Sequence, residues 1–478
     1  MTQILRKRIK IVTLLFCFSF LFTSCNKKEN KPNVIFILVD DLGWTDTSSY
    51  GSKFYQTPNI DYLASNGVKF TNAYAASNVC SPTRASILTG KYPARLHLTD
   101  FIPGKISPNT KLLPPKWNKF LDTSEITIAK AFKNYGYTTA HIGKWHLGKD
   151  KKYWPENHGF DINIGGWSSG QPIINKRKNS NGYFSPYGNP KLEDGKQGEY
   201  LTKRLTEEAK QFIKNNQSKP FFLNLWFYSV HTPLQAEKEK IEKYQRKKNK
   251  SIHHKNPTYA AMVEHVDDAV GEIIKTLQDL HLDKETIIVF TSDNGGLIGN
   301  HARFKEKVTS NYPLRSGKGD VYEGGVRVPT IFYYPSKIKP RAEKTPIISV
   351  DFFPTLLQLS EIKNKDDYNF DGVSLADILI KNENLEVRPL FWHYPHYHTE
   401  GAKPHSAIRF KNYKLIHHLE TDSLQLFNLE KDIGEKINIA NIKPKTTVKL
   451  FSMLQEFKQK VKAQEPIINL KYIKYEQE

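Results

Sequence analysis

Cysteine is scarce in this sequence: three occur among 478 residues, and methionine is equally rare. Three cysteines exclude a disulfide-stapled scaffold, and a chain of this length buries a full core without one. Acidic residues number 49 against 70 lysines and arginines, so the formal net charge is +21. Such a chain should attract polyanions, whether nucleic acid, anionic lipid or acidic polysaccharide. No internal repeat is visible, while 38% hydrophobic and 12% aromatic residues exclude wholesale disorder.

The N-terminus lacks an apolar run long enough to span a bilayer, but it has the parts of an export signal. A basic segment ends at Lys10, an apolar run covers 11–22, and small residues precede Cys25, as in a bacterial lipoprotein signal. We predict a signal peptide at 1–24, lipid attachment at Cys25 and a tether at 25–31. The protein is then exported and lipid-anchored, in the periplasm or at the cell surface. Ordinary secretory cleavage nearby is the alternative.

This leader accounts for two of the three cysteines. Cys17 is removed with it and Cys25 carries the lipid, so Cys80 remains alone in an oxidising compartment. An unpaired thiol there is either buried and inert or retained for its chemistry.

Buried strands and helical patterns alternate along most of the chain, which predicts an α/β fold with a mostly parallel sheet covered by helices on both faces. Beyond about residue 385, short alternating strands and a helical segment (443–464) predict a small antiparallel subdomain. We therefore divide the mature chain into 32–385 and 386–478. The expected strands are 33–39, 138–142, 220–228, 286–291 and 328–334, and the expected helices are 58–65, 82–89, 125–135, 200–214, 258–280 and 351–359.

Polar residues follow four of these strands. Ligands bind outside the carboxyl ends of the strands in sheets of this kind, so the four strand ends predict one active site. The residues concerned are Asp40 and Asp41, Lys144 and His146, His231, and Asp293 and Asn294. The aspartates and the asparagine offer only oxygen, which suits a hard cation such as Ca²⁺ rather than zinc.

Two basic segments lie outside the expected elements. Residues 175–199 are rich in Gly, Asn, Pro and Lys and predict a surface excursion or a lid over the active-site edge. Residues 238–255 predict a solvated helix and loop, with contact to a polyanionic substrate as the alternative.

The segment 78–90, NVCSPTRASILTG, predicts a helix that begins just after Cys80. Ser81 suits the N-cap, Pro82 the first helical position and Gly90 the C-terminal stop. Free N–H groups at such a helix start favour an anion, and Arg84 can reach the same place. A thiolate phosphatase would need five residues between cysteine and arginine, where this chain has three. A papain-like cysteine hydrolase would have no use for the acidic cluster.

The same segment resembles the C-x-P-x-R signature of the formylglycine-dependent sulfatases, in the alkaline phosphatase superfamily. Further blocks of that family are matched in order, from about residue 32 through the catalytic domain, and the C-terminal part is similar to the family's small subdomain. The matched blocks are DDLG (40–43), GYTTAHIGKWHLG (136–148), VHTP (230–233), SDNGG (292–296) and RSGKGDVYEGGVRVP (315–329).

The resemblance implies that Cys80 is oxidised before folding to formylglycine, by a sulfatase-maturing enzyme acting on the unfolded chain. The hydrated aldehyde would attack sulfur, and sulfate would leave as the aldehyde reforms. The family pattern assigns the sulfate oxygens to Arg84, Lys144 and Lys318, proton donation to the leaving alcohol to His231 with Lys318, and proton removal from the diol to His146. The implied Ca²⁺ ligands are Asp40, Asp41, residue 80, Asp293 and Asn294.

The resemblance thus implies a sulfuric ester hydrolase. Export, a lipid tether and positive charge favour a sulfated polysaccharide or its oligosaccharides, from algal galactan or ulvan to glycosaminoglycan, and we expect no nucleic-acid partner. The alternatives are a phosphonate or phosphodiester hydrolase of the same superfamily and a polyanion-binding pseudoenzyme. The predicted sugar contacts are His97, Asp100, Trp167, Arg177, His301, Arg303, His393, His396 and Arg409.

Overall fold

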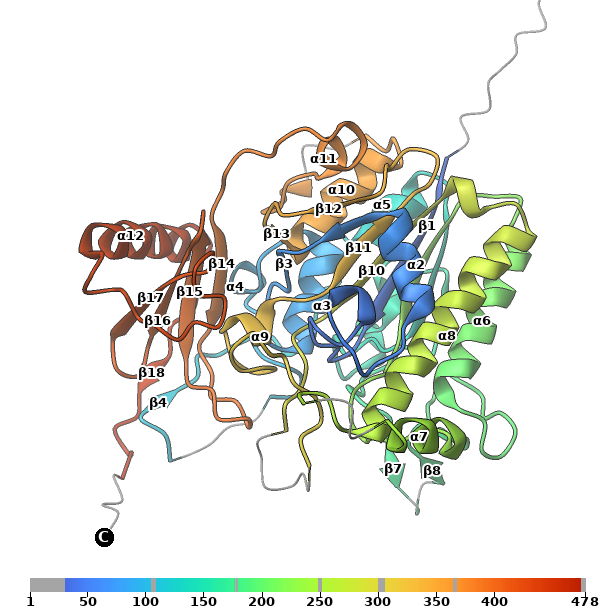
Figure 1. Cartoon of the computed structure of the whole chain (residues 1–478), viewed down its shortest axis with the longest axis horizontal. Coiled ribbons are helices and arrows are strands. Elements are labelled where there is room, and N and C mark those ends of the chain that lie inside the picture. The colour runs from blue at the N-terminus through green and yellow to red at the C-terminus, as the bar shows by residue number, and fades with distance from the viewer. Residues whose placement is uncertain are drawn as a thin grey trace, which may run out of the picture. The chain divides into compact units, whose positions relative to one another are not determined.

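The structure is a computed structural model that describes residues 31–104, 109–175, 177, 179–247, 252–299, 306–363 and 368–473. In it, the five apolar runs expected to be strands all lie in one eight-stranded sheet. The strand order is β12-β2-β11-β10-β1-β9-β5-β6, and only β11 runs opposite to its neighbours (Figure 1). The strands are β1 (Asn33–Val39), β2 (Val68–Phe70), β5 (Thr138–Gly143), β6 (Ile162–Ile164), β9 (Phe221–Trp226), β10 (Thr286–Ser292), β11 (Thr330–Tyr333) and β12 (Arg341–Glu343).

Helices cover both faces of this sheet, so alternate side chains of its central strands enter two different cores. In β1, Ile35 and Ile37 join the core under one helical layer, whereas Val34 and Phe36 join the core under the other. The first layer contains α2 (Pro58–Asn66), α6 (Leu201–Asn215) and α8 (Pro257–Asp279). The second contains α3 (Cys80–Thr89), α5 (Ile128–Asn134), α10 (Phe352–Leu359) and α11 (Ala376–Lys381).

The C-terminal part forms the antiparallel sheet that the alternating pattern predicted. Its strands β14 (Leu390–Tyr394), β15 (His405–Phe410), β16 (Tyr413–His418) and β17 (Ser423–Asn428) pair in chain order, and α12 (Pro444–Lys460) contacts β15 and β16. A third core joins this sheet to residues of the larger part, including Tyr74 and Val326. Residues 32–478 form one compact unit, and the boundary predicted at 385 falls between α11 and β14.

Short elements complete the described chain. They are η1 (Ser48–Tyr50), α4 (Pro93–Leu96), η2 (Lys151–Tyr153), η3 (Pro155–His158), α7 (Lys238–Gln245), η6 (Asp283–Glu285), α9 (Glu323–Val326) and η7 (Ser349–Asp351), with the strand pairs β3 (Ala73–Tyr74) and β13 (Ile347–Ile348), β4 (Leu112–Leu113) and β18 (Ile467–Ile468), and β7 (Ile174–Asn175) and β8 (Ser180–Asn181).

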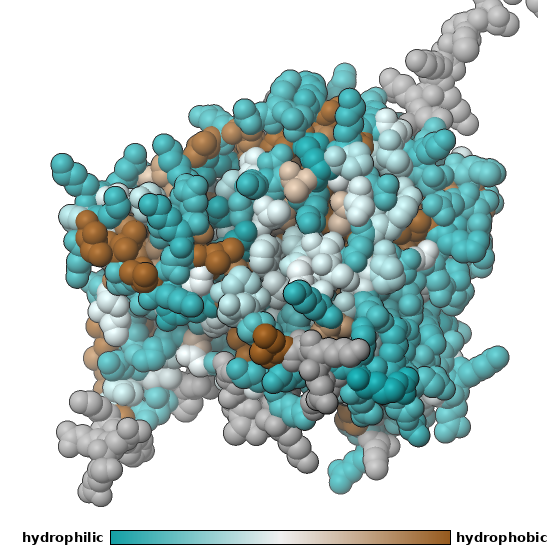
Figure 2. Space-filling view, in the orientation of Figure 1, coloured by the Kyte–Doolittle hydropathy of each residue, from teal (hydrophilic) through white to brown (hydrophobic). Residues whose placement is uncertain are grey.

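Polar residues cover most of the face drawn in Figure 2, with the largest brown patch beside α12. None of the helices in the described part of the chain is long and apolar enough to cross a membrane. The predicted signal peptide, Cys25, residues 26–30 of the tether, His301 and Arg303 lie outside the described residues.

Candidate active site

The register of the parallel strands brings the predicted polar residues to one edge of the sheet. Val39 of β1 lies opposite Ser292 of β10, so the residues that follow, Asp40 and Asp293, leave the sheet side by side. β9 is the neighbour of β1 on the other side, and β5 follows it. The four strand ends therefore converge, as the sequence predicted.

Residue 80 faces this edge from the first turn of α3. The helix begins at Cys80 itself, with Val79 in extended conformation as the N-cap, so the expectation that Ser81 caps the helix is wrong. The Ser81 hydroxyl instead donates to the backbone oxygen of His146, at 2.8 Å. Gly90 ends the helix in the left-handed conformation, as expected.

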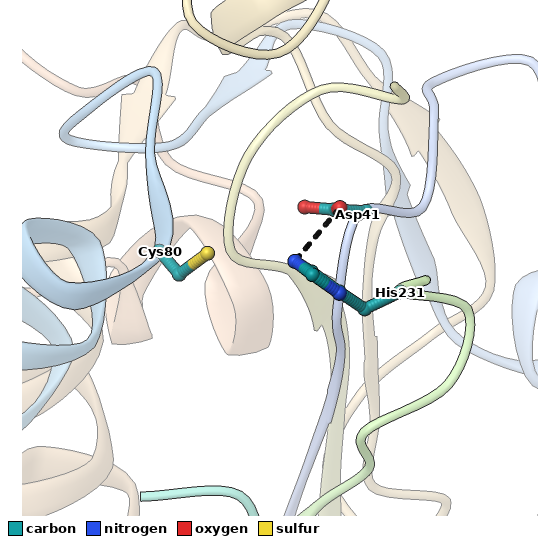
Figure 3. A group of neighbouring side chains, drawn as sticks. All are labelled: Asp41, Cys80 and His231. Atoms are coloured by element: carbon teal, nitrogen blue, oxygen red, sulfur yellow. Dashed lines mark ion pairs between the residues drawn. The ribbon is translucent and has the colours of Figure 1, made fainter. Parts of the chain in front are cut away.

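Three carboxylates and one imidazole lie around Cys80. Oxygen atoms of Asp40 and Asp293 lie within 4.8 Å of each other and of the Cys80 sulfur, as do an oxygen of Asp41 and a nitrogen of His231. Figure 3 shows the side chains of Cys80, Asp41 and His231 converging from three different segments. Asn294 donates from Nδ2 to Oδ1 of Asp41 at 2.8 Å.

Three buried cations pair with these carboxylates. Arg84 donates from Nε to Oδ2 of Asp293 at 2.8 Å, and Lys144 Nζ lies 2.5 Å from Oδ2 of Asp40. Lys318 Nζ lies 2.7 Å from Oδ1 of Asp41, and its side chain is 9% exposed. The predicted cationic and acidic residues thus form one buried network.

The network leaves an opening for a cation. Oδ1 of Asp40 and Oδ1 of Asn294 are buried without a hydrogen-bond partner among the described residues. Burial raises the pKa of Asp40 well above its ordinary value, and the charge of Asp293 raises it further. Burial also opposes ionisation of Asp41, but the charges of Lys318, His231 and Lys144 together outweigh burial and lower that pKa. A hard cation bound by these oxygens would remove the penalty at Asp40, so the donor set fits Ca²⁺.

The Cys80 thiol is not prepared for nucleophilic attack. Burial raises its pKa to about 12, although Lys144 and Lys318 act in the opposite direction. Cysteines that react as thiolates have pKa values depressed by their surroundings. The unmodified thiol therefore fits neither a thiolate phosphatase nor a papain-like hydrolase.

Two histidines border the same space. Burial holds the pKa of His146 well below its ordinary value, and Nε2 of this residue contacts the backbone oxygen of Ile102. Burial likewise lowers the pKa of His231 to about 3; its Nδ1 lies 2.8 Å from the Thr232 oxygen and its Nε2 lies 3.7 Å from Asp41. His146 and Asp41 both adopt left-handed backbone conformations, with φ of 62° and 63°, as is common at functional sites.

A cavity of about 300 Å³ opens onto residue 80. The predicted residues Cys80, His146, His231 and Lys318 line it. Thr232 lies in the matched VHTP block but has no role assigned from sequence. Sequence reasoning missed the other lining residues, which come from loops without a recognisable signal: Phe101, Ile102, Pro103, Gly170, Gln171, Leu297, His398, Thr399 and Glu400.

A glycine lets the C-terminal loop reach this cavity. A Cβ atom on Gly319 would lie 2.0 Å from Nδ1 of His398, and its φ of 90° disfavours any other residue. Gly319 follows Lys318 directly, and its nitrogen donates to the Asn78 oxygen at 2.8 Å. Residues 398–400 therefore pack against the loop that carries Lys318.

None of the predicted sugar contacts that the structure describes lines this cavity. Asp100, His393 and His396 are buried and hydrogen-bonded to protein: Asp100 to Tyr394, His393 to Ser406 and Gln464, and His396 to Thr99. Their polar atoms are thus used within the fold. Of the rest, His97 contacts the Lys462 oxygen, Trp167 packs against a core, Arg177 is exposed and Arg409 lines a second cavity.

The excursion at 175–199 is anchored behind the active site by Tyr183. This tyrosine is fully buried, and its hydroxyl lies 2.6 Å from the backbone oxygen of Tyr228 and 2.8 Å from that of His231. In the basic segment 238–255, Lys240 and Lys243 of α7 pair with Glu264 of α8 at 2.6 and 2.8 Å, so these two charges serve helix packing.

Two family models match the chain. Residues 32–362 match the model described as Sulfatase, and residues 317–464 match the one described as N-sulphoglucosamine sulphohydrolase, C-terminal. Together they cover the catalytic part and the C-terminal sheet.

Individual relatives agree with these matches. A sulfatase of Formosa agariphila is 33% identical over 92% of this chain and 90% of that protein. The N-acetylgalactosamine-6-sulfatase of Homo sapiens is 31% identical over 76% of this chain and 68% of that protein. The solved structure of Ps i-CgsB in complex with k-i-k-neocarrahexaose superposes with a TM-score of 0.76 at 31% identity, over 89% of this chain and 92% of that one.

Proposed function

Because this chain belongs to the sulfatase family of sulfuric ester hydrolases, we propose that it removes sulfate from a sulfated polysaccharide or from its oligosaccharides. The observation that carries the proposal is the buried network of acids and cations around residue 80, beside a cavity that opens onto it. Relatives named for N-acetylgalactosamine 6-sulfate, and one solved with a carrageenan-type hexaose, support galactans and glycosaminoglycans as the substrate class.

Residue 80 acts as formylglycine in this proposal. The hydrated aldehyde supplies an oxygen nucleophile, which the protonated thiol of Cys80 does not. Cys80 is only 2% exposed in the folded chain, so a maturing enzyme has to act before folding. The C-S-P-T-R motif supports this assignment.

The acidic cluster would hold Ca²⁺ through Asp40, Asp41, Asp293 and Asn294. The ion supplies positive charge for a sulfate oxygen when it is bound. The unpartnered oxygens of Asp40 and Asn294 support this assignment, because they are the ligand type that Ca²⁺ prefers.

The cations divide into two roles. Lys318 lines the cavity, so it contacts a sulfate oxygen and neutralises the charge that develops as the ester bond breaks. Arg84 and Lys144 do not line the cavity and bond to Asp293 and Asp40, so we assign them to holding these carboxylates rather than to the sulfate oxygens that the resemblance implies. This arrangement orients residue 80 toward the sulfur atom.

Both histidines line the cavity and are assigned a proton transfer. His231, whose Nδ1 is held by the Thr232 oxygen, donates a proton to the departing sugar oxygen. Because burial lowers its pKa to about 3, this role requires that the negative charge of the bound sulfate ester raise that pKa until Nε2 is protonated. Lys318 contacts the same carboxylate, Asp41, that lies 3.7 Å from His231. His146 removes the proton from residue 80 that accompanies sulfate release. Its contact with the Ile102 oxygen orients the ring toward the cavity.

We further propose that the enzyme is exported and held at a membrane by a lipid on Cys25. The basic, apolar and small-residue segments before that cysteine support the proposal.

A sulfate-release assay tests the proposed function. The protein is produced with a sulfatase-maturing enzyme and assayed on defined sulfated oligosaccharides and on phenyl phosphonate. Mass spectrometry should find an aldehyde at residue 80, sulfate release should exceed phosphonate hydrolysis, and Cys80→Ala should abolish both. Full activity in protein whose residue 80 is entirely free thiol would overturn the mechanism, and faster phosphonate hydrolysis would overturn the substrate class.

A further inference from the structure

A second cavity, of about 820 Å³, lies where β15 and β16 meet the larger part of the protein. Figure 1 shows these strands beside β3 and α9, and Lys414 of β16 pairs with Glu323 of α9 at 2.9 Å. The cavity shares no lining residue with the one at residue 80. Its lining includes Arg327, Lys344, Arg388, Arg409, Lys411 and Glu430.

Cationic side chains dominate this lining, five against two carboxylates. Arg327 and Arg388 pair with Glu323 and Asp351, which lie outside the lining. Lys344, Arg409 and Lys411 have no ion pair within the described part of the chain, and Glu430 is occupied by Asn412 at 2.7 Å.

Arg409 is the most unusual of these cations. Its side chain is 6% exposed, and its hydrogen bonds go to the Tyr74 hydroxyl and the Lys411 oxygen, not to a carboxylate. Nε of Arg388 is also buried without a partner among the described residues. Burying a guanidinium away from a carboxylate costs free energy unless an anion compensates it. Arg388 is already compensated by Asp351, and the charge of Glu323 acts on Arg409, so the cations left to meet an anionic ligand are Lys344, Lys411 and Arg409, which has no ion pair among the described residues.

We propose that this second cavity binds a sulfated or carboxylated segment of a polysaccharide, apart from the catalytic cavity. Among its lining residues no aromatic side chain is present, so stacking of nucleic-acid bases is not provided for. The Asn384 amide, which makes no hydrogen bond within the described part of the chain, suits a sugar hydroxyl group, whereas Asn72, Asn412 and Thr345 bond to protein. The catalytic cavity, at about 300 Å³, is small for a polymer, so a second contact would keep the polymer close.

The ligand class rests on the proposed function, but the binding test is independent of turnover. Lys344 and Lys411 are exposed at this cavity, so Lys344→Glu/Lys411→Glu should fold normally. Lys445→Glu/Lys460→Glu, on exposed positions of α12, makes the same charge change elsewhere. Both pairs are placed in the Cys80→Ala protein, and binding to immobilised carrageenan, chondroitin sulfate and uncharged dextran is measured by biolayer interferometry.

The Lys344→Glu/Lys411→Glu variant should bind the sulfated polymers at least about tenfold more weakly, because each lost contact between a lysine and an anionic group weakens polyanion binding steeply. The α12 variant should change little, and nitrophenyl sulfate turnover with Cys80 intact should be equal in both. Equal weakening in both variants, no detectable polymer binding, or competition by a DNA oligonucleotide as strong as by sulfated polymer would overturn the inference. Polymer binding without any sulfate ester turnover would overturn the proposed function instead.

Discussion

Arg84 and Asp293 form an ion pair in which neither side chain is exposed, with Nη2 and Oδ2 2.7 Å apart. The pair joins the second turn of α3 to the end of β10, and Arg84 also donates from Nη1 to the Lys144 oxygen at 2.9 Å. The guanidinium of Arg84 thus fixes the helix that carries residue 80 to Asp293, a proposed metal ligand.

Arg84→Met should lower the free energy of unfolding by about 3–5 kcal/mol, because the carboxylate of Asp293 stays buried without its partner. Urea denaturation measures the change. Lys275→Met is the matched control, since its pair with Asp279 is largely exposed and should contribute less than about 1 kcal/mol. Equal losses in the two variants would contradict the importance of the buried pair.

Removal of Ca²⁺ should lower the melting temperature of the protein. Without a cation, Oδ1 of the buried Asp40 carboxyl has no hydrogen-bond partner among the described residues, and the pKa of this group is raised by burial and by Asp293. Thermal unfolding is followed in EGTA and after addition of Ca²⁺ or Zn²⁺, and Ca²⁺ should stabilise more. Asp40→Asn should reduce this stabilisation, whereas Asp279→Asn, on the exposed end of α8, should not. Stronger stabilisation by Zn²⁺ would contradict an oxygen-ligand site.

His231→Ala should separate substrates by the quality of their leaving group. Loss of a general acid should slow release of a sugar alcohol by roughly 10²–10⁴-fold. Nitrophenyl sulfate should be affected far less, because nitrophenolate departs without protonation. Steady-state kcat on both substrates measures the difference, and His253→Ala, at an exposed histidine, is the control. An equal loss on both substrates would argue that His231 serves binding or structure.

Tyr183→Phe should alter how His231 is positioned, although residue 183 itself does not line the catalytic cavity. The variant removes the hydroxyl that lies 2.8 Å from the His231 oxygen and should cost about 1 kcal/mol of stability. We expect kcat on a sugar sulfate to fall while kcat on nitrophenyl sulfate stays nearly constant, in a folded protein. Tyr187→Phe, which loses a hydroxyl bond to Glu199 in the same excursion, should leave the ratio of the two rates unchanged. The prediction fails if both rates fall in parallel.

The buried carboxyl of Glu435 should make stability depend on pH. Burial, together with the charge of Glu323, raises its pKa from 4.5 to about 8. Between these values the unfolded chain has lost the proton that the folded chain keeps, so the free energy of unfolding should fall as pH rises from about 5 to 8. Glu435→Gln, measured by urea denaturation at several pH values, should flatten this slope. Glu193→Gln, at an exposed glutamate, is the control, and an unchanged slope in Glu435→Gln would contradict the assignment.

Much of the sheet and of the catalytic cluster was predictable from sequence. Long apolar runs identify β1 and β10, and the carboxyl-end rule for parallel strands places Asp40 and Asp293 together. The predicted sugar contacts are another matter. Nothing in the sequence around His393 and His396 distinguishes them from exposed histidines. Only the packing of the folded chain shows that their ring nitrogens bond to protein. Whether they contact sugar stays a prediction that their burial disfavours.

The sequence by itself determined the α/β architecture, the converging acids and cations and the lone Cys80, because strand hydrophobicity and residue type are local properties. Only the tertiary structure decided which loops line the cavity. Phe101 and His398 meet there because two segments far apart in the chain pack together, and Gly319 permits their approach. The second cavity arises in the same way, since Arg327, Arg388 and Arg409 gather only when the C-terminal sheet docks. Long-range packing selects such neighbours, and no short stretch of sequence encodes it.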